Sequence, residues 1–179
     1  MSLKITKNLL RECKALKKNI IAVDPGSKYI GLALANFEQN YVEMTPLGHI
    51  TQTTKAQDLE QLRKHINDHN VGGLIIGDPI VGEYDETGEG LRRAKHTKTF
   101  MKDFDKYITT SYCYQNETNS SESSTRTLKE FEVACQKPFL DEVSAMSIMA
   151  QCFCDNCGEV SDNVALVRGR SIHFGSNED

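Results

Sequence analysis

The most restrictive feature of the sequence is a short apolar run that ends in an acidic residue. Residues 20–23 are apolar and mostly β-branched, Asp24 follows them, and Pro25-Gly26-Ser27 is a typical turn. A second apolar stretch begins at Tyr29. The pattern predicts a β-hairpin whose first strand is buried and ends in a carboxylate. Such a carboxylate is costly near apolar neighbours unless a positive partner accompanies it, and a metal ion is one natural partner.

The rest of the chain alternates between strand-like and helix-like segments. Further strands are expected at 41–50, 71–76 and 109–117, the first of them near a sheet edge because Pro46 interrupts it. Helices are expected at 54–70, 91–107 and 140–153, with Pro138 breaking the chain before the last one. This order predicts an α/β domain with a mixed sheet flanked by helices. We expect a basic amphipathic helix at 1–18, the main domain at 19–154 and a polar tail at 155–179.

Composition restricts the class of protein and its surroundings. The 179 residues include 21 Lys and Arg against 25 Asp and Glu, a net charge of −4, which argues against wholesale coating of nucleic acid but allows a local basic face. No apolar run approaches the ~18–20 residues of a membrane span. The six cysteines come without a secretory leader and are expected to be reduced thiols, so we expect an intracellular protein, in the cytoplasm or in an organelle. The oligomeric state is not predicted.

The first 18 residues carry a net charge of +5, with leucines at roughly helical spacing. Three interpretations remain open for this segment. It is a helix docked on the domain by its leucines Leu3, Leu9, Leu10 and Leu16, an arm that contacts phosphates, or the remnant of an organelle-targeting segment.

Three carboxylates are candidates for chemistry. Asp24 ends the first strand, Glu117 ends another, and Asp141 lies in the first turn of the last helix. Two of them have a simpler structural interpretation, since Asp24 can cap its own turn and Asp141 suits the positive end of a helix dipole. If the three converge, they repel one another unless divalent cations bind among them. Such a site would suit Mg²⁺ and two-metal hydrolysis of phosphodiesters.

Four segments, in order and spacing, resemble the YqgF family of the ribonuclease H superfamily. They read DPGSKYIGLA from Asp24, IIGDP from Ile75, NETNSS around Glu117 and LDEVSAMSIMAQCF from Leu140. The resemblance covers roughly residues 20–153. It includes Gly26 and Gly31 of the first motif and the Gly77 and Pro79 turn of the second.

The resemblance implies a fold, an activity and a site. The fold is a five-stranded mixed sheet whose first three strands are antiparallel, with helices on both faces. The activity is Holliday-junction-resolvase-like phosphodiester hydrolysis in ribosomal RNA precursor maturation, with structured RNA a more favoured partner than branched DNA. Asp24, Glu117 and Asp141 match the catalytic acids and would hold Mg²⁺ or Mn²⁺. The residues expected at nucleic acid are hydroxyl and basic side chains: Ser27, Lys28, Arg92, Arg93, Lys95 and Ser120.

The chain departs from the family pattern at two positions. Tyr29 and Thr118 stand where bacterial members usually carry arginine. Because arginine binds phosphate bidentately, its absence should weaken phosphate binding. The alternative function is therefore a catalytically inactive RNA-binding or ribosome-assembly factor that retains the fold. Sugar kinases and actin-like ATPases share the opening hairpin, but they need a two-lobed body far longer than this chain.

The cysteines near the last helix are a further candidate site. Cys152, Cys154 and Cys157 could bind zinc only if Cys135 or His173 supplied a fourth ligand, and reduced, partly buried thiols are the simpler interpretation.

Overall fold

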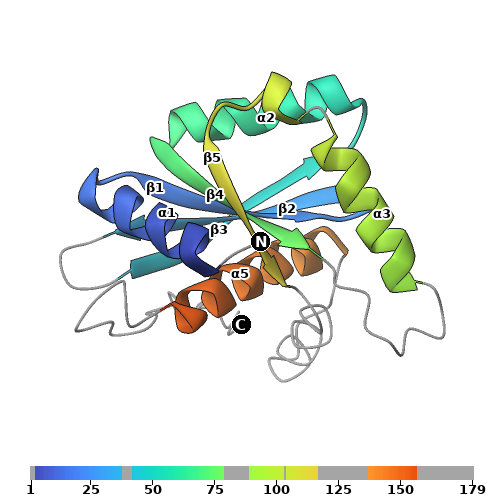
Figure 1. The fold of residues 1–179 in the computed structure, drawn as a ribbon. Coiled ribbons are helices and arrows are strands. Elements are labelled where there is room, and N and C mark those ends of the chain that lie inside the picture. The colour runs from blue at the N-terminus through green and yellow to red at the C-terminus, as the bar shows by residue number, and fades with distance from the viewer. Residues whose placement is uncertain (1–2, 38–41, 79–88, 103, 117–136, 157–179) are drawn as a thin grey trace, which may run out of the picture.

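The structure is a computed structural model that describes residues 3–37, 42–78, 89–102, 104–116 and 137–156 (Figure 1). Its elements in chain order are α1 (Leu3–Ala15), β1 (Asn19–Pro25), β2 (Tyr29–Phe37), β3 (Val42–Thr51), α2 (Lys55–Asp68), β4 (Val71–Asp78), α3 (Glu89–Met101), the 3₁₀ turn η1 (Phe104–Lys106), β5 (Ser111–Asn116) and α5 (Lys137–Asp155).

The five strands form one mixed sheet in the order β3-β2-β1-β4-β5. β1, β2 and β3 are joined in antiparallel register, whereas β4 and β5 run parallel to β1. This arrangement confirms the predicted mixed sheet with an antiparallel first half. β3 lies at one edge of the sheet, where the proline within it removes no hydrogen bond to a further strand.

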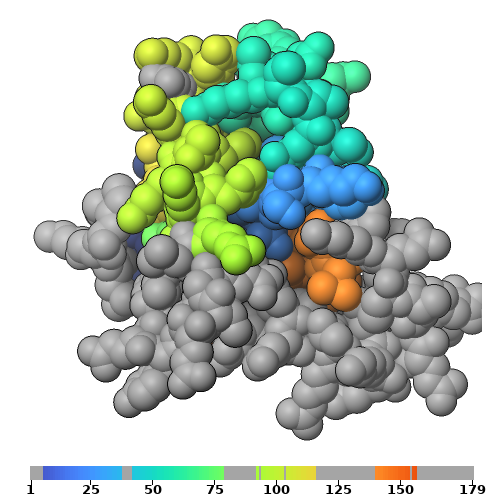
Figure 2. Space-filling view, turned by 90° about the vertical axis from the view of Figure 1, so that its right-hand side faces the viewer, coloured from blue at the N-terminus to red at the C-terminus, as the bar shows by residue number. Residues whose placement is uncertain are grey.

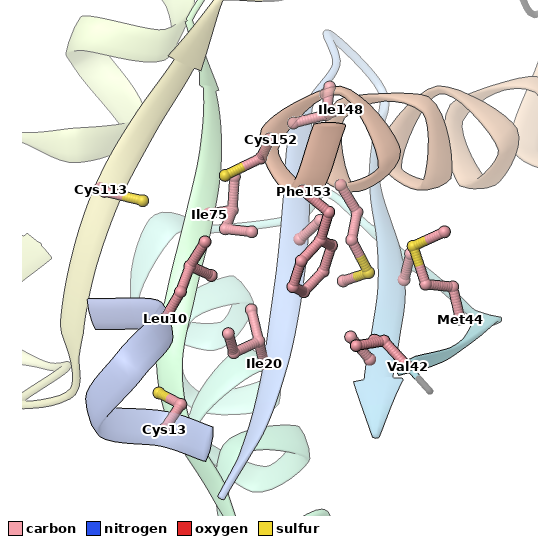
Figure 3. Close-up of a cluster of buried hydrophobic side chains, with 14 of the residues drawn as sticks. Leu10, Cys13, Ile20, Val42, Met44, Ile75, Cys113, Ile148, Cys152 and Phe153 are labelled. Atoms are coloured by element: carbon pink, nitrogen blue, oxygen red, sulfur yellow. The ribbon is translucent and has the colours of Figure 1, made fainter. Parts of the chain in front are cut away.

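Helices cover both faces of the sheet (Figure 1). On one face α1 and α5 bury a core with side chains of alternate strand positions, including Ile20, Ala22, Ala33 and Ile75 (Figure 3). On the other face α2, α3 and η1 cover the intervening positions, among them Ile21, Val23, Ile30, Leu32 and Ile76. The near-continuous apolar run of β1 follows from this double coverage, since every one of its inner residues meets a core.

Helix α1 is part of the core. Leu9, Leu10 and Cys13 are buried against the sheet, which is the packing that a docked amphipathic helix requires. The helix lies close on β4 because Gly73 has no side chain: a Cβ there would come within 2.9 Å of Leu9 and 3.0 Å of the Cys13 sulfur. Leu16, expected on the same apolar stripe, is 61% exposed because the helix ends at Ala15.

Several element boundaries differ from those expected. The helix expected at 91–107 begins at Glu89 and ends at Met101, and the 3₁₀ turn that follows buries Phe104 in the core. Pro138 does not precede the last helix but lies in its first turn, where a missing N–H costs nothing. Among the described residues, no helix combines the length and the apolar character needed to cross a membrane.

Candidate active site

Asp24 lies at the carboxyl end of β1, beside the turn that leads into β2. Its register partner on β2 is Gly31, and partners in antiparallel strands project to the same face of a sheet. Asp24 alternates with Ala22 and Ile20, so its side chain lies on the face covered by α1 and α5. The residue is only 9% exposed. A carboxylate is therefore held at the rim of an apolar core.

Asp141, in the first turns of α5, packs directly over this hairpin. An added Cβ on Gly31 would lie 2.0 Å from the carbonyl oxygen of Asp141 and 2.4 Å from its carbonyl carbon. An added Cβ on Gly26 would lie 3.6 Å from the carboxyl carbon and from Oδ1 of Asp141, and the other oxygen, Oδ2, is buried. The two glycines thus allow α5 to approach β2 until the Asp141 carboxylate lies beside the turn that follows Asp24.

The third predicted acid, Glu117, lies outside the described residues, as do Ser120 and Pro79. The described part of β5 ends at Asn116. Its Gln115 donates a hydrogen bond from Nε2 to Oδ2 of Asp155 at 3.0 Å, so this residue faces α5. Tyr114 faces the other way, where burial, and then the negative charges of Tyr112 and Asp78, raise the pKa of its hydroxyl to about 12.

A second pair of side chains, not singled out in the sequence, lies next to the two aspartates. His49 is the register partner of Gly31 on β3, and its Nδ1 lies 2.9 Å from Oε1 of Glu142. The ring of His49 also meets Tyr29 edge-on, with centroids 5.1 Å apart. No local motif marks His49, because its position depends on the pairing of β2 with β3 and on the docking of α5.

The turn after Asp24 is supported from the opposite side by Gln52, which sequence reasoning also missed. Its side-chain amide donates to the carbonyl oxygen of Gly26 at 2.5 Å. The same nitrogen lies 3.3 Å from Nε2 of His96 on α3. The turn is thereby linked through one side chain to the helix that carries the basic cluster.

The predicted nucleic-acid contacts are exposed where the structure describes them. Ser27 and Lys28 lie in the turn, and the Lys28 ammonium lies 5.2 Å from the centre of the Tyr29 ring. Arg92 and Lys95 are exposed on α3, whereas nothing is described of the Arg93 side chain. Figure 2 shows α3, the start of β2 and the start of α5 on one side of the molecule. Helix α3, which carries the exposed Arg92 and Lys95, therefore lies on the same side of the molecule as the start of β2.

The far end of α3 is fixed by a lysine on α2. Lys55 Nζ donates to the carbonyl oxygens of Thr99, at 2.8 Å, and of Lys102. A cation at this end of a helix also complements the helix dipole. The basic helix is therefore anchored at its end by Lys55 and is in contact with the turn through His96.

Carboxylate oxygens are the donors that Mg²⁺ and Mn²⁺ prefer, and Asp24 and Asp141 supply them from two elements. Within the ranges that the structure describes, no set of three or more His, Cys, Asp or Glu side chains is arranged to hold a metal. The two aspartates therefore fit an oxygen-ligated cation that also needs a donor from elsewhere in the chain.

Cys152 is a buried residue of the core and does not suit a zinc site. It is fully buried on α5 opposite Cys113 of β5 (Figure 3). The hydrogen bond between the two thiols lowers the pKa of Cys113 and outweighs the opposite effect of burial there. In Cys152 the same hydrogen bond and burial both raise the pKa. The Cys154 side chain and Cys135, Cys157 and His173 lie outside the described residues. Of the predicted zinc ligands, the one described is thus an apolar core residue.

Comparison with known proteins identifies the family. The family described as "RuvX: Holliday junction resolvase" matches residues 18–155. The chain belongs to the RuvX family. This membership confirms the resemblance to YqgF proteins found in the sequence, and it places the chain among Holliday-junction-resolvase-like nucleases.

Three relatives of this RuvX-family chain carry the same name. A protein of Rickettsia akari named "Putative pre-16S rRNA nuclease" is 31% identical over 129 residues, which cover 71% of this chain and 80% of the relative. A protein of Rickettsia peacockii with the same name is 32% identical over 131 residues, 72% of this chain and 81% of the relative. One from Prochlorococcus marinus strain MIT 9301 is 29% identical over 144 residues, 79% of this chain and 88% of the relative.

Solved structures similar to this RuvX-family chain include Holliday junction resolvases. The fowlpox virus resolvase aligns with a TM-score of 0.47 and 13% identity, covering 76% of this chain and 99% of the resolvase. RuvC of T. thermophilus in complex with a Holliday junction substrate aligns with a TM-score of 0.41 and 9% identity, covering 76% of this chain and 95% of RuvC.

Proposed function

We propose that this chain is a metal-dependent nuclease that hydrolyses phosphodiester bonds in structured RNA, in the maturation of ribosomal RNA precursors. The observation that carries the proposal is the approach of Asp141 to the Asp24 hairpin across Gly31 and Gly26. Carboxylates from β1 and α5 lie beside the same turn, at a rim between an apolar core and the surface. That is a costly arrangement for folding alone and a useful one for binding divalent cations.

Glu117 is the proposed third acid. It matches the second acid of the family by its sequence position and follows directly after the described end of β5 at Asn116. Asp78, at the end of neighbouring β4, alternates with Ile76 on the other face and is a poorer candidate.

The proposed roles follow from what each group can do. Asp24, Asp141 and Glu117 would hold Mg²⁺ or Mn²⁺, and a bound cation of this kind activates water and stabilises the leaving oxygen. Gly26 and Gly31 let α5 lie close to the hairpin, and this sets the position of Asp141 beside the turn. Gln52 holds the turn in place through the Gly26 carbonyl. The carboxylates need no proton transfer of their own to perform this binding role.

Basic side chains would position the nucleic acid. Lys28 in the turn and Arg92, Arg93 and Lys95 on α3 are proposed phosphate contacts, with Ser27 and Ser120 as hydroxyl donors. Relatives named for pre-16S rRNA favour RNA over branched DNA as the substrate. Free, buried thiols at Cys13, Cys113 and Cys152 agree with a reducing, cytoplasmic location.

A cleavage assay tests the proposal. The substrates are an RNA hairpin from a small-subunit ribosomal RNA precursor end and a four-way DNA junction, each with Mn²⁺, with Mg²⁺ or with EDTA. We expect the RNA to be cut with metal and intact in EDTA. The variants Asp24→Asn and Asp141→Asn should lose at least about 10–100-fold in rate, because a ligand charge is removed.

Asp68→Asn is the matched control, since Asp68 is exposed on α2 far from the hairpin, and it should cut like the wild type. Equal cleavage in EDTA would contradict the metal mechanism. Retention of the RNA hairpin without cleavage under any metal condition would select the binding-factor alternative, and preferential cutting of the DNA junction would replace RNA as the substrate.

A further inference from the structure

Three strands align one residue each in a row that begins at Asp24. The register pairs Asp24 with Gly31, and Gly31 with His49, and paired residues of antiparallel strands share a face. Neighbouring strands are ~4.8 Å apart, so the backbones of Asp24 and His49 are about 10 Å apart. Asp141 covers the glycine between them. His49 therefore lies on the same face as the acids, one step away along the sheet.

The His49 side chain is held on two sides. Nδ1 is 2.9 Å from the Glu142 carboxylate, and the ring contacts Tyr29 edge-on. The His49 side chain remains 31% exposed, against 16% for Glu142. Among the described residues, the other ring nitrogen, Nε2, makes no hydrogen bond. The ring is thus oriented by protein contacts and retains a polar atom for another partner.

The chemistry of that atom follows from the partner of the first. A carboxylate only accepts hydrogen bonds, so Nδ1 must carry the proton that it donates to Glu142. In the neutral imidazole, Nε2 is then an acceptor with an exposed lone pair. Phosphate oxygens are acceptors and cannot pair with it. The nucleic-acid backbone offers one donor, the ribose 2′-hydroxyl, which DNA lacks.

We propose that His49, oriented by Glu142, accepts a hydrogen bond from a ribose 2′-hydroxyl beside the acids and so selects RNA over DNA. This inference rests on the proposed function, because it takes the Asp24 and Asp141 rim as the place where the nucleic acid binds. A purely structural role for the pair, joining α5 to the edge strand β3, would affect stability and leave the preference between RNA and DNA unchanged.

The test compares the binding of an RNA hairpin and a DNA hairpin of the same sequence, by fluorescence anisotropy in EDTA at pH 7.5. The measured quantity is the ratio of the two Kd values, so contacts common to both nucleic acids cancel. His49→Leu should reduce the preference for RNA about fivefold, the effect of losing one hydrogen bond. His49→Gln, which can place an acceptor oxygen near the position of Nε2, should keep most of it.

Glu142→Gln should also lower the preference, because an amide can donate as well as accept and no longer fixes the tautomer. His65→Leu on α2 is the matched control and should leave the ratio unchanged. Thermal unfolding of each variant separates loss of fold from loss of contact. If His49→Leu does not fold, the other two variants test the inference: Glu142→Gln should lower the preference for RNA, and His49→Gln should keep most of it.

An unchanged ratio in His49→Leu, or equal weakening of RNA and DNA binding, would overturn the inference; the second result would indicate a phosphate contact. Because the assay contains no metal, it is independent of cleavage. If the protein never cuts RNA but His49→Leu lowers its preference for RNA, the nuclease activity is refuted and the proposed contact is supported. If the protein cuts RNA with metal but His49→Leu leaves the ratio of the two Kd values unchanged, only the proposed contact is refuted. Binding of neither hairpin would refute this contact, whereas the cleavage assay with metal decides the nuclease.

Discussion

Replacement of Gly31 by alanine is a direct perturbation of the contact between α5 and the hairpin. The new Cβ would lie 2.0 Å from the carbonyl oxygen of Asp141, whereas carbon contacts are comfortable at about 3.5 Å. The backbone of α5 would therefore have to move by about 1.5 Å, because neither contacting atom belongs to a flexible side chain. That movement would carry the Asp141 carboxylate away from Asp24.

Two magnitudes follow for Gly31→Ala. Overpacking costs about 1–3 kcal/mol, and the stiffer unfolded chain returns about 0.4–1 kcal/mol, so a net loss of about 1–2 kcal/mol is expected. For a domain of this size that lowers Tm by about 2–8 °C. A displacement of 1 Å or more at a catalytic group lowers the rate about 100-fold. Calorimetry measures the first effect, and metal-dependent cleavage of the RNA hairpin measures the second.

Gly73→Ala is the matched control. Gly73 is also a buried strand glycine, but its added Cβ would meet the flexible ends of Leu9 and Cys13 at 2.9 and 3.0 Å. We expect Gly73→Ala to cost up to about 1–3 kcal/mol by overpacking α1, and to leave cleavage unchanged because α5 is not displaced. If Gly31→Ala unfolds at the wild-type temperature and cuts at the wild-type rate, the close approach of α5 to β2 does not set the position of Asp141, and the reasoning fails.

Two further predictions concern α1 and its thiol. Leu10→Ala should destabilise the protein by about 2–5 kcal/mol in urea titration, since Leu10 is fully buried; a loss below about 1 kcal/mol would contradict the packing of α1 on the sheet. Burial, the charge of Glu12 and the nearby Cys113 raise the pKa of the Cys13 thiol to about 11. At pH 8 only about 0.1% of it is then thiolate, so iodoacetamide should label Cys13 slowly in the native protein and promptly in urea, as peptide mass spectrometry would show.

The hairpin and the mixed sheet were predictable because their signals are local. The apolar run before Asp24, the turn at Pro25 and the interruption of β3 by Pro46 each act within a few residues. The ends of helices that depend on tertiary contacts were harder to predict from the sequence. Leu16 fits the apolar spacing of α1, yet the helix ends one residue earlier and exposes it. Pro138 is a helix breaker in general, but position within the first turn decides its effect.

Some residues of the candidate site were likewise proposed from the sequence, and others became evident only in the structure. Asp24 and Asp141 were proposed from strand-end and helix-start patterns together with the family resemblance. His49 and Gln52 were not, because their roles depend on which residues face them across the sheet: His49 meets Glu142 from α5, and Gln52 meets the Gly26 carbonyl. Such partners are distant in sequence, and only strand register and helix docking bring them together.

The position of Asp24 near the beginning of the chain and of Asp141 on the last described helix has a consequence during synthesis. A nascent chain that has emerged only as far as β4 already has most of its sheet, but it lacks the helix that covers the hairpin. In that state it exposes an apolar sheet face and has no means of gathering cations. Under the function proposed above, a copy that stops before α5 lacks Asp141 and would not hydrolyse RNA, so hydrolytic capacity would arise only after α5 has been made.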